Sequence, residues 1–286
     1  MGRVVLETSA RWANRVDSLL AVTDDLSFAL RLADAADAVT ADRFGALDLH
    51  VDTKPDLTPV SDADRAAEDA IRRLIAIERP ADGVIGEERG TSGTAPRHWI
   101  VDPIDGTKNY VRGVPVWATL IALATELPAT ETRHIELGVV SAPAIGRRWW
   151  ASRGQGSWLR TTGDPVKLHV SGVGNLSDAS LGYSEWGDPA WDSGSRRASF
   201  DRLLRSAWRS RAYGDFWSHM MVAEGSVDAA LEPELSVWDM AALIPIVEEA
   251  GGTITALDGS SPTVGGNAVS SNGLLHPSLL AQFTAP

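Results

Sequence analysis

The sequence contains no cysteine among its 286 residues. Disulfide bonds, thiolate catalysis and zinc or iron–sulfur sites with cysteine ligands are therefore excluded. A lack of disulfides fits a protein that works in the cytoplasm, and we expect that location.

Basic residues are also scarce. Lys and Arg total 26 against 38 Asp and Glu, which gives a net charge of -12. A nucleic-acid binder needs a basic surface, so we expect no nucleic-acid partner. The acidic balance does not exclude a small anionic substrate, because acids clustered around divalent cations lose their repulsion for phosphate.

Long apolar runs are absent as well. No window approaches the roughly 18 uninterrupted apolar residues of a membrane span. The first residues, "MGRVVLETSARWANRVDSLL", carry charges throughout, unlike a signal peptide. We therefore expect no membrane partner. Residues 1–23 have two interpretations, a loose N-terminal extension or an over-long reading of the start site.

The composition is otherwise that of a globular protein with a full core, with 44% hydrophobic and 22% charged residues. The pattern of predicted helices and strands changes near residue 170. Residues 24–170 contain two helical patterns and several short apolar runs between turns, which predict an α+β half with a mostly antiparallel sheet. Residues 171–286 alternate strands with helices, which predicts an α/β half.

The stretch "WIVDPIDGTKNY" (99–110) places Asp102 and Asp105 at the end of an apolar strand. A buried carboxylate is costly unless positive charge compensates it. Pro103 fixes the backbone between the two acids, which leaves the carbonyl of Ile104 free to act as a ligand. By itself the motif is either an ordinary turn or a cation site.

Other acids stand at the ends of predicted elements: Glu87 and Glu88 after a strand, Asp62 and Asp64 at the start of a helix with Ser61 as N-cap, and Asp239 in the first turn of a helix predicted in "SVWDMAALIPIVEEAGG" (236–252). Each acid alone is typical of a solvated strand end or of a helix start. In combination with the 99–110 motif they indicate a site for Mg²⁺, which prefers hard oxygen ligands.

Four stretches in this order, "DTKPDLTPVSDAD" (52–64), "GEE" (86–88), "WIVDPIDGTKNY" (99–110) and "VWDMAALIPIVEEAGG" (237–252), resemble the inositol monophosphatase family. This family contains Mg²⁺-dependent phosphatases and shares its fold type with fructose-1,6-bisphosphatase. The resemblance covers about residues 24 to 283. It implies a layered αβαβα sandwich of α+β and α/β parts, and a homodimer.

The resemblance also implies a metal set. Glu87, Asp102 and the carbonyl of Ile104 would hold one Mg²⁺. Asp102, Asp105 and Asp239 would hold a second, and Glu87 with waters a third, weaker ion. Asp105 and Asp239 would also face the substrate.

The catalytic and phosphate-binding residues follow from the same resemblance. Thr107 would pair with Asp62 and, together with Glu87, activate a water molecule on the metal. The backbone N–H groups of Gly106 and Thr107 would bind the phosphate. Lys54 would lie on a loop that covers the metals. All the acids of this set are present, which argues against a non-catalytic binding module.

Several segments, "GTKNYVRGVPVWATLIAL" (106–123) among them, are similar to the bacterial histidinol-phosphate phosphatases of the family. Asp215 stands where the inositol enzymes have a small apolar residue, and Glu232 where they contact inositol hydroxyls. Our hypothesis is that these two carboxylates recognise the ammonium and the imidazole of L-histidinol phosphate. The alternative for Asp215 is a helix cap.

The sequence therefore predicts a metal-dependent phosphomonoesterase that acts on L-histidinol phosphate in histidine biosynthesis. An inositol-1-phosphatase or a broad sugar-phosphate phosphatase on the same scaffold is the alternative. Trp117, Arg112 and Arg153 are further candidates for lining the pocket, with core packing as the alternative for Trp117.

Overall fold

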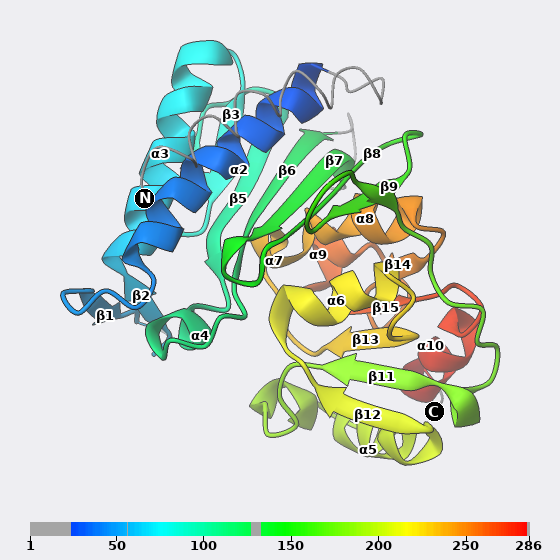
Figure 1. The fold of residues 1–286 in the computed structure, drawn as a ribbon. Helices are drawn as coiled ribbons and strands as arrows, with labels where there is room; N and C mark the ends of the chain where they lie inside the picture. Colours follow the sequence, from blue (N-terminus) through cyan, green and yellow to red (C-terminus); the bar gives the residue numbers. More distant parts are fainter. Residues whose placement is uncertain (1–23, 56, 127–132, 285–286) are drawn as a thin grey trace.

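The computed structural model describes residues 24–55, 57–126 and 133–284 (Figure 1). The expected N-terminal extension, 1–23, lies outside these residues. Within the described part of the chain, no helix is long and apolar enough to cross a membrane.

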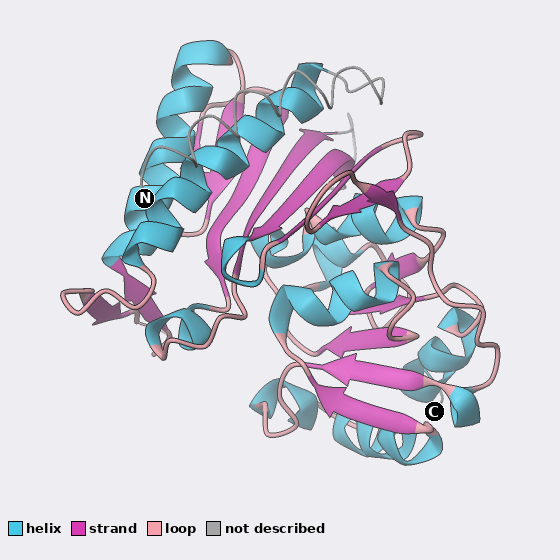
Figure 2. Cartoon of the chain, viewed as in Figure 1, coloured by secondary structure: helices cyan, strands magenta, loops and turns pink. Residues whose placement is uncertain are grey.

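The chain forms two β-sheets with helices between them and on their outer faces (Figures 1 and 2). The outer helices and the helices between the sheets pack through separate apolar clusters. This arrangement confirms the predicted αβαβα sandwich. From one outer face to the other, the helical layers are α2 (Asp24–Arg43) with α3 (Asp62–Glu78), α6 (Asp215–Ala223) with α8 (Leu243–Glu249), and α5 (Arg196–Ser206) with α10 (His276–Thr284).

The larger sheet has eight strands in the order β10-β9-β8-β7-β6-β5-β3-β4. Neighbouring strands are antiparallel except β3 and β5, which are parallel. The prediction of a mostly antiparallel sheet is thus confirmed. Its strands are β3 (Gly83–Gly86), β4 (Gly90–Ser92), β5 (Arg97–Asp105), β6 (Ala118–Glu126), β7 (Arg133–Ala142), β8 (Arg147–Ser152), β9 (Ser157–Arg160) and β10 (Val166–Lys167).

The smaller sheet has five strands in the order β12-β11-β13-β15-β14. Strand β11 is parallel to both of its neighbours, whereas β15 is antiparallel to β13 and β14. Its strands are β11 (Ser180–Tyr183), β12 (Arg209–Ala212), β13 (Ala229–Glu232), β14 (Thr253–Thr255) and β15 (Ala268–Ser271).

Short elements complete the fold. They are the hairpin β1 (Val51–Thr53) with β2 (Pro59–Ser61), the helices α4 (Thr107–Val111), α7 (Val237–Met240) and α9 (Pro262–Gly265), and the 3₁₀ turns Pro143–Ile145, Leu176–Asp178 and Pro189–Asp192.

Helix α3 begins with the capping box that its sequence predicts. The Ser61 hydroxyl accepts a hydrogen bond from the Ala63 N–H at 3.2 Å, and the Asp64 carboxylate accepts one from the Ser61 N–H at 2.8 Å. Both orphan donors at this helix end are satisfied. The bonds also fix the buried Asp64 side chain in one orientation.

The helix predicted over 236–252 is instead two short helices, α7 and α8. Pro245 has no N–H to donate to the carbonyl of Ala241, so the hydrogen-bond ladder is interrupted between them. The junction packs closely on the larger sheet, because an ideal Cβ on Gly138 of β7 would lie 2.1 Å from the Ala242 carbonyl oxygen. Gly138 thus allows the α7–α8 segment to rest against the sheet.

We expect Gly138→Ala to destabilise the protein by about 1–3 kcal/mol, the usual cost of forcing a methyl group into a packed interior. The substitution should also weaken Mg²⁺ binding, because the displaced segment carries Asp239. The measurement is urea unfolding together with a Mg²⁺ titration. Gly172→Ala is the matched control, since no atom lies within 4 Å of its Cβ position. Equal stability of the two variants would contradict this account.

Candidate metal centre and active site

A cavity of about 650 Å³ lies between the two sheets. Its walls come from the end of β5, from α4, and from the starts of α6 and α7. We call it the acidic cavity, because nine carboxylates line it: Glu87, Asp102, Asp105, Glu185, Asp188, Asp215, Glu232, Glu234 and Asp239.

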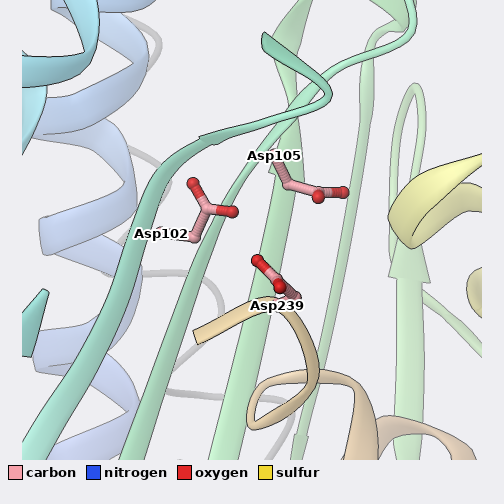
Figure 3. A group of neighbouring side chains, drawn as sticks. All are labelled: Asp102, Asp105 and Asp239. Carbon is pink, nitrogen blue, oxygen red and sulfur yellow. The ribbon is translucent and has the colours of Figure 1, made fainter. Parts of the chain in front are cut away.

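Three of these carboxylates converge on one point (Figure 3). Asp102, Asp105 and Asp239 each offer one oxygen atom, and the three atoms lie within 4.8 Å of one another. Asp102 and Asp105 both belong to β5, whose pairing with β6 shifts register between them. This irregularity brings two acids of one strand to the same side. Asp239 reaches them from α7 in the other half of the chain.

Backbone N–H groups hold each of the three aspartates in place. Asp102 accepts a hydrogen bond from the Ile104 N–H at 2.9 Å, Asp105 from the Phe216 N–H at 2.8 Å, and Asp239 from the Ser236 N–H at 2.7 Å. The bond to Ser236 belongs to a second capping box, at the start of α7. The convergence is therefore built into the backbone rather than left to free side chains.

The three aspartates repel one another in the absence of a cation. None has an ion-pair partner among the described residues. Burial, followed by the charges of neighbouring acids, raises the pKa values of Asp102 and Asp105 well above their ordinary range. Burial likewise raises the pKa of Asp239 to about 7, although its bond from Ser236 lowers it. Hard oxygen donors that lack a counter-charge fit a divalent cation such as Mg²⁺.

Glu87 and Glu88 follow β3 beside this group, as the sequence predicts. The Lys54 Nζ atom lies 2.6 Å from Glu87 and 2.5 Å from Glu88. Burial lowers the pKa of Lys54, but its bonds to both carboxylates raise it more. Glu87 is thus close to the three aspartates and is paired with a cation from the β1–β2 hairpin loop.

The expected pairing of Thr107 with Asp62 is wrong. The Thr107 hydroxyl lies 3.3 Å from Asp64 Oδ1 and 2.9 Å from the Ile104 carbonyl oxygen. Asp62 does not line the cavity; it forms an ion pair at 2.9 Å with Arg43 at the end of α2, and its side chain is 42% exposed. The capping box turns Asp64 inward, which leaves Asp62 on the outer side of the helix start. Burial raises the pKa of Asp64 to about 6.

Gly106 links β5 to α4 and lines the cavity beside Thr107. Its φ angle of 83° lies in the left-handed region, and a Cβ atom there would meet the Val116 carbonyl oxygen at 3.1 Å and Asp215 Oδ2 at 3.2 Å. Both the conformation and the space therefore require glycine.

Asp215 begins α6 with a φ angle of 49°, which is unfavourable for a residue other than glycine. The helix has no side-chain capping bond, so Asp215 does not act as a cap. Burial raises the pKa of its carboxyl, and the charge of Lys108 lowers it. Strained backbone is retained where the surroundings fix it, commonly at functional sites.

Glu232 ends β13 and is only 3% exposed. The Ser184 hydroxyl donates to its Oε2 atom. Its Oε1 atom has no hydrogen-bond partner within the described ranges. Burial raises the pKa of this carboxyl well above its ordinary range. Such a group lacks a partner that a bound molecule can supply.

Three further candidates do not line the cavity. Trp117 is fully buried and packs on Phe44 and Tyr110, with ring centroids 5.4 and 4.9 Å away. Arg153 forms an ion pair with Glu248 elsewhere, and Arg112 is exposed.

The cavity also contains residues that the sequence reasoning did not assign to it. One is Trp238, next to Asp239, which contributes an aromatic side chain. Another is Ser184, which directly follows β11. The position of Trp238 within "VWD" was the one available signal for it. Nothing local distinguishes Ser184 from the other serines of the chain.

The two-sheet fold and the group of three converging aspartates are those of a phosphatase family. The chain matches the inositol monophosphatase family over residues 22–285 and belongs to that family.

Among its relatives, the chain is 59% identical to a histidinol-phosphatase of Streptomyces coelicolor, covering 90% of this chain and 96% of the relative. It is 55% identical to a histidinol-phosphatase of Mycobacterium tuberculosis, covering 92% and 98%. Similar solved structures include the extragenic suppressor protein suhB from Bartonella henselae, with a TM-score of 0.82, 26% identity and coverage of 92% and 99%. The structure of an inositol monophosphatase from Zymomonas mobilis has a TM-score of 0.76 and 30% identity, covering 91% of this chain and 98% of that chain.

The raised pKa values predict how pH and Mg²⁺ affect stability. A carboxyl with a raised folded-state pKa stabilises the fold while it is protonated and ceases to do so as pH rises through that pKa. For Asp239 this interval runs from about 4 to about 7. In EDTA, the melting temperature should therefore be lower at pH 8 than at pH 5.5. Mg²⁺ binds the ionised carboxylates, so it should raise the melting temperature more at pH 8. An equal Mg²⁺ effect at both pH values, measured by calorimetry, would refute this prediction.

Proposed function

We propose that this protein is a Mg²⁺-dependent phosphomonoesterase that hydrolyses L-histidinol phosphate to L-histidinol and inorganic phosphate, a step of histidine biosynthesis. The observation that carries the proposal is the pair of carboxylates, the half-buried Asp215 and the buried Glu232, in the same cavity as the three converging aspartates. A substrate with an ammonium and an imidazole supplies the positive and hydrogen-bonding partners that these acids lack. The names of the two most similar relatives given above support the same substrate.

Two or three Mg²⁺ ions fit the donor set. Asp102, Asp105 and Asp239 would hold one ion between them. Glu87 and the Ile104 carbonyl would supply further oxygen ligands for the other ions. When bound, these ions neutralise the phosphate and lower the pKa of the attacking water. Glu87 takes part only after Lys54 releases it, since the two side chains are paired here.

Thr107 and Asp64 orient the attacking water. The Thr107 hydroxyl lies 2.9 Å from the Ile104 carbonyl oxygen and 3.3 Å from Asp64 Oδ1. With the Ile104 carbonyl engaged by a bound ion, the hydroxyl would donate to Asp64, and its lone pairs would accept a hydrogen bond from that water. As the water attacks, its proton moves to Thr107 Oγ1 while the Thr107 proton moves to Asp64 Oδ1. Asp64 is suited to this, because its raised pKa of about 6 is close to neutral pH.

Asp215 and Glu232 bind different parts of the leaving group. Asp215 Oδ2 lies against Gly106, which together with Thr107 offers the N–H groups proposed to bind phosphate. In L-histidinol phosphate the ammonium stands one carbon from the phosphorylated carbon, so Asp215 is placed to bind it. The imidazole extends farther, toward Glu232, whose orientation Ser184 fixes.

The second candidate is an inositol-1-phosphatase or a broad sugar-phosphate phosphatase. A relative from Caulobacter vibrioides that is 34% identical is named inositol-1-monophosphatase. Inositol hydroxyls could donate to the same two carboxylates, so the metal chemistry would be unchanged. The presence of every acid of the metal set disfavours a binding module without activity. We further propose a cytoplasmic homodimer, which light scattering in solution tests.

The first experiment measures phosphate release from L-histidinol phosphate and from inositol 1-phosphate, with Mg²⁺ and with EDTA. We expect EDTA-sensitive release with a strong preference for L-histidinol phosphate. Asp215→Ala should raise KM for L-histidinol phosphate about 10- to 100-fold, the range of a lost charge-assisted hydrogen bond. The same variant should change turnover of inositol 1-phosphate little. A preference for inositol 1-phosphate in the unmodified protein would overturn the substrate assignment and retain the metal mechanism.

The Thr107 contact predicts different effects for two neighbouring aspartates. Asp64→Asn should lower kcat about 100-fold, because proton transfer through Thr107 loses its acceptor. Asp62→Asn removes only an exposed ion pair, so we expect kcat to stay within about twofold and stability within about 1 kcal/mol. Steady-state kinetics at saturating Mg²⁺ decide between them. If Asp62→Asn is the inactive variant, Asp64 is not the catalytic partner of Thr107.

A further inference from the structure

The chain uses lysine very sparingly. Of its 26 basic residues, 23 are arginine and three are lysine: Lys54, Lys108 and Lys167. Two of the three, Lys54 and Lys108, line the acidic cavity. No arginine lines it within the described residues. The cavity thus holds two of the three lysine ammonium groups, in a chain whose basic side chains are mostly planar guanidinium groups.

The two cavity lysines differ in their partners. Lys54 is half-buried and engaged by Glu87 and Glu88. Lys108 is exposed, and no carboxylate lies within ion-pair distance of it in the part of the chain that the structure describes. Its ammonium is therefore available to an anionic ligand, although acids surround it.

Lys108 lies next to the proposed phosphate site. It is the second residue of α4 and directly follows Thr107. Its positive charge acts on Asp215, whose Oδ2 atom lies against Gly106. The ammonium is thus within electrostatic reach of the Gly106–Thr107 turn.

We propose that Lys108 binds the phosphate group, both in the ester substrate and in the inorganic phosphate product. The inference rests on the proposed phosphomonoesterase function of the cavity. A lysine ammonium is an established kind of phosphate partner and acts as a point charge. Of the two cavity lysines, only Lys108 can meet the phosphate without first leaving a carboxylate. It would add a protein-borne positive charge to that of the bound metal ions.

The test compares Lys108→Met with Lys167→Met in the Mg²⁺-loaded protein. Lys167 is an exposed lysine on β10, outside the cavity. Inorganic phosphate is the probe, measured as an inhibitor of L-histidinol phosphate hydrolysis. We expect Lys108→Met to weaken phosphate inhibition about tenfold, the loss of one charged contact. Lys167→Met should leave it unchanged. Lys108→Arg should recover part of the loss, because the charge is retained.

A second probe separates phosphate binding from an effect on Asp215. L-Histidinol carries the ammonium and imidazole but no phosphate. If Lys108 served only as a charge partner of Asp215, Lys108→Met would change inhibition by L-histidinol and leave phosphate inhibition intact. That result would overturn the proposal. Weaker phosphate inhibition with L-histidinol inhibition within twofold of the unmodified protein supports it.

Carbon-13 labelling of lysine side chains gives a readout that does not depend on turnover. Three lysine signals are expected, and the two methionine variants assign them. Phosphate should shift the Lys108 signal and leave that of Lys167 in place. An unresponsive Lys108 in a protein that hydrolyses L-histidinol phosphate refutes the inference but not the proposed function. A responsive Lys108 in a protein that does not hydrolyse this ester refutes the proposed substrate and retains the phosphate contact.

Discussion

Repulsion among the three converging carboxylates of the candidate metal centre is the constraint on which the rest of the structure depends. Asp102, Asp105 and Asp239 lie together with their pKa values raised, and the described residues supply none of them with an ion-pair partner. A fold can keep such a group only if the surrounding backbone prevents the side chains from turning away. The N–H groups of Ile104, Phe216 and Ser236 provide that restraint.

The restraint depends on contacts between segments far apart in the sequence. The carboxylate of Asp105 is held by the first turn of α6, and Asp239 is presented by a segment that rests against Gly138 of β7. The two sheets are therefore joined at the site itself as well as through the apolar layer of α6 and α8. A change in the packing between the sheets would alter the spacing of the acids directly.

Much of this could be predicted from the sequence, because the relevant signals are local. The capping box of Ser61 and Asp64, the acids after β3 and the D-P-I-D turn each combine a residue type with a fixed spacing. The partner of Thr107 could not be chosen in this way. Positions 62 and 64 both hold aspartate, so residue type alone does not choose between them, and it is Arg43, from another helix, that pairs with Asp62 on the outer side. The break between α7 and α8 was readable from Pro245, but the apolar pattern obscured it. Trp117 illustrates the converse, since it precedes β6 and is buried by its packing on Phe44 and Tyr110.

The backbone hydrogen bonds to the three aspartates also bear on which cation the site selects. In each carboxylate one oxygen is occupied by an N–H group, which leaves the other oxygen for the ion. An ion that binds through the other oxygen leaves this hydrogen bond intact, which favours binding through a single atom. Ca²⁺ commonly takes both oxygens of a carboxylate and accepts six to eight ligands, whereas Mg²⁺ requires a tight octahedron of single donors. The same bonds that hold the acids together therefore favour the coordination typical of the smaller ion.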